Sequence, residues 1–192
     1  WQARPVRGEV GILFVPEANL FNSLQQGSTE WFAEAARGAY QGFFDLNVQP
    51  DWLHVDHLFA SDGTPAPYRL LYLPYPVHLR PETAARLATW VEQGGTLVSA
   101  GCLGYFGVRG RAGAVQPNLG LDAVFGAREH YVEFAPDIAG DVTFSLDGVD
   151  GAVPGALFLQ AYEPAGGRVA GAYPQGYGDA GGLPAVIDHT YG

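Results

Sequence analysis

Four short apolar segments place the strongest constraint on how this chain can fold. They occupy residues 10–15, 52–55, 70–73 and 96–100, and proline, aspartate or glycine follows each of them. Short apolar runs of this length are typical of strands that are buried on both faces of a sheet. We therefore expect four strands that other elements cover on both sides.

Helical patterns lie between these predicted strands. Aromatic and small residues recur every three or four positions over residues 29–44, after a polar start at Ser28. A second helix is expected to begin at Pro81, a residue that favours the first helical turn, and to end at Gly94 and Gly95. This order of strands and helices, with short connections, predicts an α/β fold with a parallel sheet covered by helices.

The second half of the chain has a different pattern. A short helix is expected over residues 119–125, and strands follow between turns, over residues 131–134, 142–144, 156–159, 169–172 and 185–187. At 192 residues the chain has the length of one ordinary domain. Because it begins without methionine and stops soon after a strand, we expect a single domain over residues 1–192, excised from a longer protein and truncated at both ends.

Composition argues against several classes of partner and cofactor. The 20 acidic residues outnumber the 10 basic ones and give a formal net charge of −10, so we expect no nucleic-acid partner. No apolar run approaches the roughly 20 residues that cross a bilayer, so we expect no membrane association and a cytoplasmic location. One cysteine excludes a disulfide framework and a cysteine-built zinc site. His54, Asp56 and His57 form the richest group of possible ligands, but in a strand His57 points away from the other two. We therefore expect neither a metal nor another cofactor.

Several longer segments resemble one known family. They include residues 68–74, 79–82 and 90–98. The last of these contains Val-Glu-Gln-Gly-Gly-Thr-Leu-Val, a run that specifies the fold better than the exact family. Further matches keep the order of the family, at residues 8–13, Tyr40, 55–58, 119–126 and 182–192. Together these segments resemble the middle, or trimerisation, domain of glycoside hydrolase family 42 β-galactosidases.

This resemblance implies both a fold and a role. The implied fold is class I glutamine amidotransferase-like, a flavodoxin-like three-layer sandwich with a mostly parallel sheet and a strand-rich second half. The implied role is non-catalytic: the domain would support a homotrimer, contact the catalytic barrel of the parent enzyme and wall the neighbouring active site, with a galactoside at the rim as a further partner. In that family two glutamates of a separate (β/α)₈ barrel cut the glycosidic bond, and no part of this chain has the pattern of such a barrel.

Cys102 supports an alternative function, a cysteine-dependent amidotransferase or related hydrolase. It follows a predicted strand in Ala-Gly-Cys-Leu-Gly, where amidotransferases carry their nucleophile. Pro74 and Pro76, however, stand where an oxyanion hole needs N–H groups, and no carboxylate stands two residues after His189 to orient it as a base. We therefore predict a buried thiol and no catalytic residue in this domain.

A binding site is expected at the carboxyl edge of the predicted sheet, where ligands bind in open α/β folds. Polar and aromatic side chains follow three of the strands there: Glu17, Asn19, Tyr75, His78, Cys102 and Tyr105. The same residues could instead cap helices, form turns or face a partner subunit, and these alternatives stay open.

Two further features concern possible contacts. Residues 107–113 form a loop with Arg109 and Arg111, which we expect at an active-site rim or a subunit contact. In the Gly- and Pro-rich tail, Tyr162, Tyr173 and Tyr177 are candidates for an exposed interface or for stacking on sugar rings. The tail tyrosines leave a carbohydrate-binding module as a third possible function.

Overall fold

The computed structural model describes residues 6–192, and for residues 136–140, 154 and 156 it describes the backbone alone. The chain forms two compact units, of which one ends at Arg111 and the other spans Ala112–Gly192. Each unit contains a sheet of four strands. None of the described helices is long and apolar enough to cross a membrane.

The sheet of the first unit is parallel throughout. Its strands are β1 (Val10–Phe14), β2 (Asp51–His54), β3 (Leu70–Pro74) and β4 (Thr96–Ala100), in the order β2-β1-β3-β4. All four match the predicted strands. The central strands are the most deeply buried, because side chains on both of their faces are covered: Ile12, Leu13, Leu71 and Leu73 are inaccessible to solvent.

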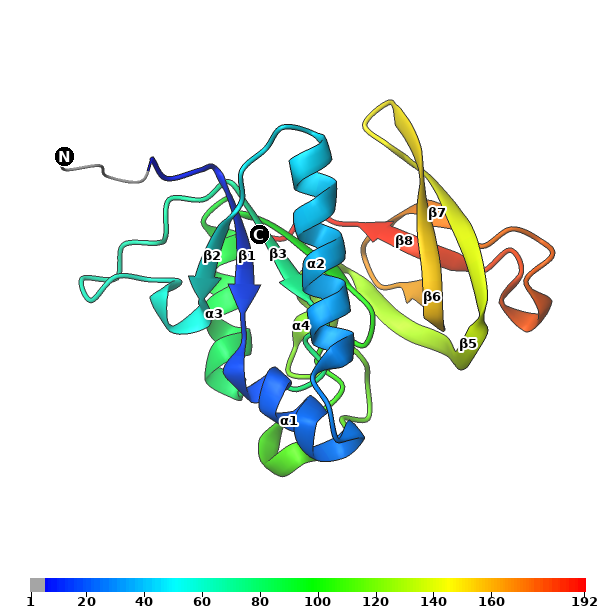
Figure 1. The fold of residues 1–192 in the computed structure, drawn as a ribbon, viewed down its shortest axis with the longest axis horizontal. Helices are drawn as coiled ribbons and strands as arrows, with labels where there is room; N and C mark the ends of the chain where they lie inside the picture. Colours follow the sequence, from blue (N-terminus) through cyan, green and yellow to red (C-terminus); the bar gives the residue numbers. More distant parts are fainter. Residues whose placement is uncertain (1–5) are drawn as a thin grey trace. The chain divides into compact units, whose positions relative to one another are not determined.

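Helices cover this sheet, and Figure 1 shows α2 (Glu30–Asp45) in front of the strands and α3 (Pro81–Glu92) behind them. Both helices confirm the predicted ones, and Pro81 begins α3 as expected. A further helix, α1 (Pro16–Gln26), was not predicted, because Pro16 suggested only the end of a strand. Proline also suits the first helical position, and Gly27 ends the helix at a φ of 71°.

The strand order places a reversal of direction between β1 and β3. The chain passes from β1 to β2 on one side and then returns to β3 on the other. The segments that follow β1 and β3 therefore diverge at the carboxyl edge of the sheet, which is where open α/β sheets bind ligands. Here α1 follows β1, and residues 75–80 follow β3.

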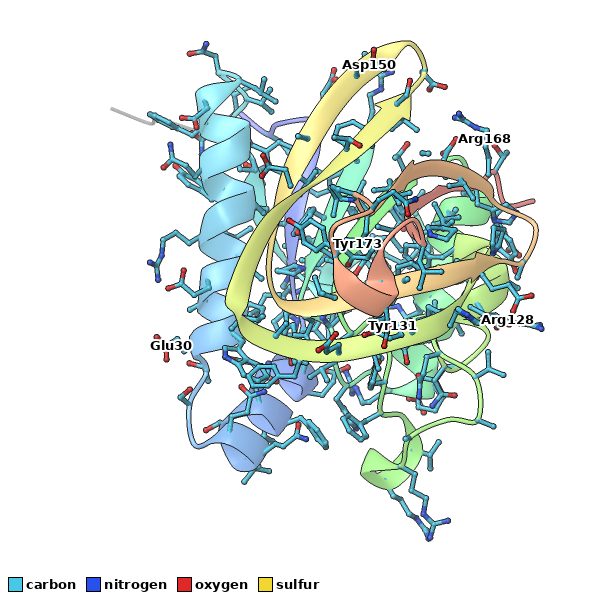
Figure 2. All side chains as sticks on the ribbon, turned by 90° about the vertical axis from the view of Figure 1, so that its right-hand side faces the viewer. Glu30, Arg128, Tyr131, Asp150, Arg168 and Tyr173 are labelled. Atoms are coloured by element: carbon cyan, nitrogen blue, oxygen red, sulfur yellow. The ribbon has the colours of Figure 1, made fainter. Side chains whose placement is uncertain are left out.

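The sheet of the second unit is antiparallel. After the short helix α4 (Leu121–Phe125) come β5 (Ala127–Leu146), β6 (Val149–Pro164), β7 (Arg168–Ala172) and β8 (Pro184–Asp188), in the order β6-β5-β7-β8. The predicted strands 131–134 and 142–144 are one strand, β5, with a change of register between Ala135 and Ala139. Figure 2 shows β5 and β6 as a long bent ribbon. Short 3₁₀ turns complete the structure at Val55–His57, Val108–Gly110 and Gly178–Ala180.

The turn after α3 generates a prediction about stability. A Cβ atom on Gly95 would lie 2.3 Å from the ring of Trp90, which is buried, whereas one on Gly38 in α2 would meet nothing within 4 Å. We expect Gly95→Ala to lower the free energy of unfolding by about 1–3 kcal/mol, because the indole has little room to move. Gly38→Ala should raise it by about 0.5–1 kcal/mol, because alanine favours a helix interior. Urea unfolding of both variants measures the contrast, and a Gly95→Ala variant as stable as the parent would contradict it.

Candidate functional site

The six residues predicted to form a site lie on three segments of the first unit. Glu17 and Asn19 belong to the first turn of α1, Tyr75 and His78 to the segment after β3, and Cys102 and Tyr105 to the segment after β4. Because these strands are parallel, all three segments begin at the carboxyl edge of one sheet. The binding role of the six residues remains a prediction, and their contacts define what each one can do.

Glu17 joins α1 to α3. One of its carboxylate oxygens accepts hydrogen bonds from Thr83 Oγ1 at 2.9 Å and from Arg80 Nε at 3.1 Å. Partial burial alone would raise the pKa of Glu17, but its backbone hydrogen bond and the bonds from Thr83 and Arg80 outweigh burial and lower it. The carboxylate is thus held in its charged form as a structural tie.

Tyr75 links the segments that follow β3 and β4. Its side chain is hydrogen-bonded to Gln26 of α1 and to Cys102, and its ring packs edge-on against Trp31 with centroids 5.7 Å apart. Burial raises the pKa of Tyr75 far above its ordinary value, and Cys102 raises it further. The hydroxyl therefore stays neutral at any physiological pH.

Cys102 lies in a strained turn of the backbone, but the residue is buried from solvent. Its φ of 50° lies in the left-handed region that favours glycine, as expected where a strand turns abruptly. Only 4% of the residue is exposed, which agrees with the predicted buried thiol. A nucleophile must be reached by its substrate, so this burial counts against acyl transfer at Cys102.

His78 is held by packing. Its ring stacks on Phe21 of α1 with centroids 5.2 Å apart, and its backbone forms an isolated bridge with Phe106. Its Nδ1 is buried and has no hydrogen-bond partner among the described protein atoms. The ring of Tyr105 packs against Phe106 at 6.3 Å.

Two residues of α1 were missed by the sequence analysis, Asn22 and Gln26. They share one helical face with Asn19, at spacings of three and four residues, and Asn22 is fully buried. Leu20 and Leu24 lie on the opposite side and are 62% and 78% exposed. A helix with amides inside and leucines outside reverses the usual pattern, and this reversal is the signal that could have identified the face.

His189 has a structural contact in the second unit. Its Nδ1 lies 3.0 Å from the carbonyl oxygen of Val124, at the end of α4. A Cβ atom on Gly126 would lie 2.5 Å from the same imidazole, so the turn after α4 packs closely on His189. This nitrogen is therefore engaged by the backbone.

An open groove of about 520 Å³ lies in the second unit, lined among others by Tyr131, Glu133, Tyr177 and Asp179. Tyr131 donates a hydrogen bond to Glu133 Oε2 at 2.6 Å. This bond is the main reason that the pKa of Tyr131 rises to about 12, with smaller contributions from slight desolvation and the charges of Glu133 and Asp179.

The tail tyrosines do not form a common exposed surface. Tyr173 is buried, and its hydroxyl accepts a hydrogen bond from the backbone N–H of Gln160 at 2.8 Å. Tyr162 donates to Gln160 Oε1 at 2.8 Å. Tyr177 alone of the three lines the groove. The prediction of an exposed interface is therefore wrong for Tyr173, which belongs to the core of the second unit.

The Gly- and Arg-containing loop presents two cations. Arg109 and Arg111 are exposed and, unlike the other arginines among the described residues, neither has an ion pair, side-chain hydrogen bond or aromatic partner. Arg109 has a φ of 57°, and the N–H of Gly107 is bonded to the carbonyl of Arg111 at 3.0 Å. Two exposed guanidinium groups without a partner among the described residues therefore lie on a sharply turned loop.

The tie between α1 and α3 predicts a pH dependence. We expect Glu17→Gln to lower the free energy of unfolding at pH 7 by about 1 kcal/mol, since Arg80 is half exposed and its attraction is screened. The folded-state pKa of Glu17 lies below its ordinary value of 4.5, so its contribution is present above that pH and is lost as the pH falls through the folded-state value. Unfolding of both proteins at pH 7 and pH 3 should show the difference shrinking, and a constant difference would contradict this account.

Burial of Cys102 predicts slow alkylation. We expect iodoacetamide at neutral pH to modify Cys102 at least about tenfold more slowly in the folded chain than in the chain unfolded by denaturant, because reaction requires local opening. Mass spectrometry of timed samples measures both rates. Faster modification of the folded chain would instead favour the amidotransferase alternative.

Comparison with known proteins identifies a family and similar solved structures. Residues 8–192 match the family of β-galactosidase trimerisation domains. The fold is similar to a GH42 β-galactosidase from G. stearothermophilus, with a TM-score of 0.79 and 24% identity over 98% of this chain and 26% of that one. It is also similar to β-galactosidases from Bacillus circulans sp. alkalophilus, with a TM-score of 0.80 and 19% identity over 96% of this chain and 27% of that one, and from Halorubrum lacusprofundi, with a TM-score of 0.75 and 21% identity over 100% and 27%.

The TM-scores show a shared fold, and the chain spans about a quarter of the length of each of these enzymes. The comparison with curated proteins found no match. The family match, however, extends over nearly all of the described residues in both units. The chain therefore belongs to the family of β-galactosidase trimerisation domains.

Proposed function

We propose that this domain holds three copies of a β-galactosidase-like glycoside hydrolase together and walls the active site of the neighbouring copy. The three solved structures compared above are β-galactosidases, and this chain spans about a quarter of each. Catalysis would then belong to another part of the parent protein, a barrel that carries the two carboxylates of a glycosidase. The domain would contribute contacts between copies rather than a reacting group.

The observation that carries this proposal is the outer part of the β5–β6 ribbon, residues 141–153, which we call the arm. Asp147 and Gly148 form its turn with φ values of 50° and 82°, and Leu146 pairs with Val149 across it. Such a two-residue turn fits the twist of a hairpin and sets the register. On its other edge β5 pairs with β7 at Thr143 and Phe144, so within the described chain the end of the arm is a two-stranded ribbon.

The register gives the arm one apolar face. Opposite residues of an antiparallel pair point to the same side, and residues alternate along each strand. One face therefore carries Val142, Phe144, Leu146, Val149 and Val153, while Thr143, Ser145 and Asp150 lie on the other. Figure 2 labels Asp150 near the end of this ribbon. Val142, at the base of the arm, is buried, whereas Val153 opposite it is 51% exposed and Leu146 and Val149 beside the turn are 37% and 64% exposed, so much of this apolar face is open to solvent.

An isolated two-stranded ribbon with an uncovered apolar face is marginally stable in water. Docking against another copy would bury this apolar face and stabilise the arm. A trimerisation domain needs such a contact between copies. A ring of three copies is built from heterologous contacts, so the arm would dock on a different surface of the next copy. The unpaired Arg109 and Arg111 are candidates for contacts at the rim of the neighbouring active site.

Neither alternative function has comparable support. An amidotransferase would need an accessible thiol, and Cys102 is buried. A sugar-binding module acting through the tail tyrosines would need them on one exposed surface, and Tyr173 is in the core.

Sedimentation velocity tests the proposal. We expect the chain to sediment as a trimer, and the double variant Val149→Asp/Val153→Asp to dissociate with a dissociation constant raised about tenfold or more, because two charges would have to be buried in the contact. Ser145→Asp/Ala152→Asp places two negative charges on the polar face of the same ribbon and should remain trimeric.

Far-UV circular dichroism would confirm that the three proteins keep the same secondary structure. If the unmodified chain of residues 1–192 sediments as a monomer at every concentration, the assembly role is overturned. A trimeric Val149→Asp/Val153→Asp variant would show instead that the arm is not the contact.

A further inference from the structure

The inward face of α1 presents buried polar atoms that have no hydrogen-bond partner in the part of the chain that the structure describes. Neither Oδ1 nor Nδ2 of Asn22 has a hydrogen-bond partner among the described protein atoms, although the residue is 0% exposed. Oδ1 of Asn19 and Oε1 of Gln26, on the same helical face, are also buried and unpartnered. Nδ1 of His78, whose ring stacks on Phe21 of the same helix, is the fifth such atom.

Five unsatisfied buried atoms would remove a large part of the stability that a domain of this size has. Buried polar atoms in proteins are hydrogen-bonded in nearly every instance, to protein, to water or to a ligand. The amides are also unnecessary for packing, since leucines at these three positions would bury apolar surface instead. The pattern therefore indicates that these groups bind something.

The atoms themselves define the chemistry of the ligand. Three amide oxygens accept hydrogen bonds, the Nδ2 of Asn22 donates, and a neutral imidazole nitrogen can do either. An anion would face three carbonyl oxygens, and a cation would find no free carboxylate on this face, because Glu17 is already bonded to Arg80 and Thr83. A hydroxyl group is neutral, and it both donates and accepts hydrogen bonds, so it matches this set.

The position in the fold supports the same interpretation. α1 follows β1, and His78 lies in the segment after β3, so the group sits where the strand order reverses. Open α/β sheets bind small ligands at this point. Aromatic side chains adjoin the polar atoms: Phe21 stacks on His78, and Tyr75, which packs edge-on against Trp31, is hydrogen-bonded to Gln26.

We infer that the amide face of α1 (Asn19, Asn22 and Gln26), together with His78, is a binding site for hydroxyl groups. These belong either to ordered water or to a small neutral sugar such as galactose. The site is independent of the assembly role proposed above, since it faces into the first unit while the arm belongs to the second.

A matched pair of variants on α1 tests whether the amide of Asn22 is bonded. If it is, Asn22→Leu removes those bonds, and we expect the midpoint of thermal unfolding to fall by about 4 °C or more. If it is not, leucine of similar size should leave the midpoint unchanged or raise it, and that result would overturn the inference. Gln25→Leu, on the exposed side of the same helix, is the control and should shift the midpoint by less than about 1 °C.

A high-resolution crystal structure of the unmodified chain, grown with and without galactose, identifies the source of the hydroxyl groups without relying on a variant that may not fold. Water within hydrogen-bond distance of Asn22 and His78 in both crystals supports a water site. Replacement of that water by galactose in the second crystal supports a sugar site. Absence of density beside these atoms in both crystals overturns the inference.

Discussion

Burial of a parallel sheet on both faces is the constraint on which the rest of the first unit depends. β1 and β3 are its central strands, and the side chains of Ile12, Leu13 and Leu71 are inaccessible to solvent. A sheet of this kind requires helices on its faces and crossover connections between its strands. Those connections bring the segments after β1, β3 and β4 to one edge, where Glu17, Tyr75 and Cys102 are held by contacts with one another's segments.

The same scaffold carries a sharp turn after β4 without an accessible nucleophile. Cys102 keeps the left-handed backbone of a sharp turn, but its thiol is buried beside Tyr75. The polar atoms that remain unsatisfied belong to α1 and His78 instead. The hydrogen-bonding groups without a protein partner at this edge are thus amides and an imidazole rather than an accessible thiol.

In the second unit the long β5–β6 ribbon contributes its inner part to the core, and its outer part forms the arm. Tyr173, Leu159 and Ala161 lie in the core, while the ribbon beyond Phe144 carries an apolar face towards solvent. A monomer would gain by making that face polar, because exposed apolar surface favours association. The exposed apolar face agrees with the assembly role proposed for a domain of this trimerisation family.

Local patterns were sufficient to predict β1 to β4, α2 and α3. The strands are short apolar runs that proline, aspartate or glycine ends, and the helices show helical spacing or clear start and stop residues. Periodicity failed at α1, where Asn22 is inward and Leu24 outward, because a helix that buries amides has no apolar stripe to detect. It also divided β5 into two strands, because the irregular register near Ala135 interrupts the alternation.

The sequence by itself determined the fold class, the family and the six side chains at the sheet edge, since these follow from local patterns and from motifs of adjacent residues. Only the tertiary structure decided that Cys102 is closed, that Tyr173 is in the core, and that the amides of α1 are enclosed without protein partners. The physical reason is that accessibility and hydrogen-bond satisfaction depend on groups distant in the chain, which meet only when the sheets and helices pack.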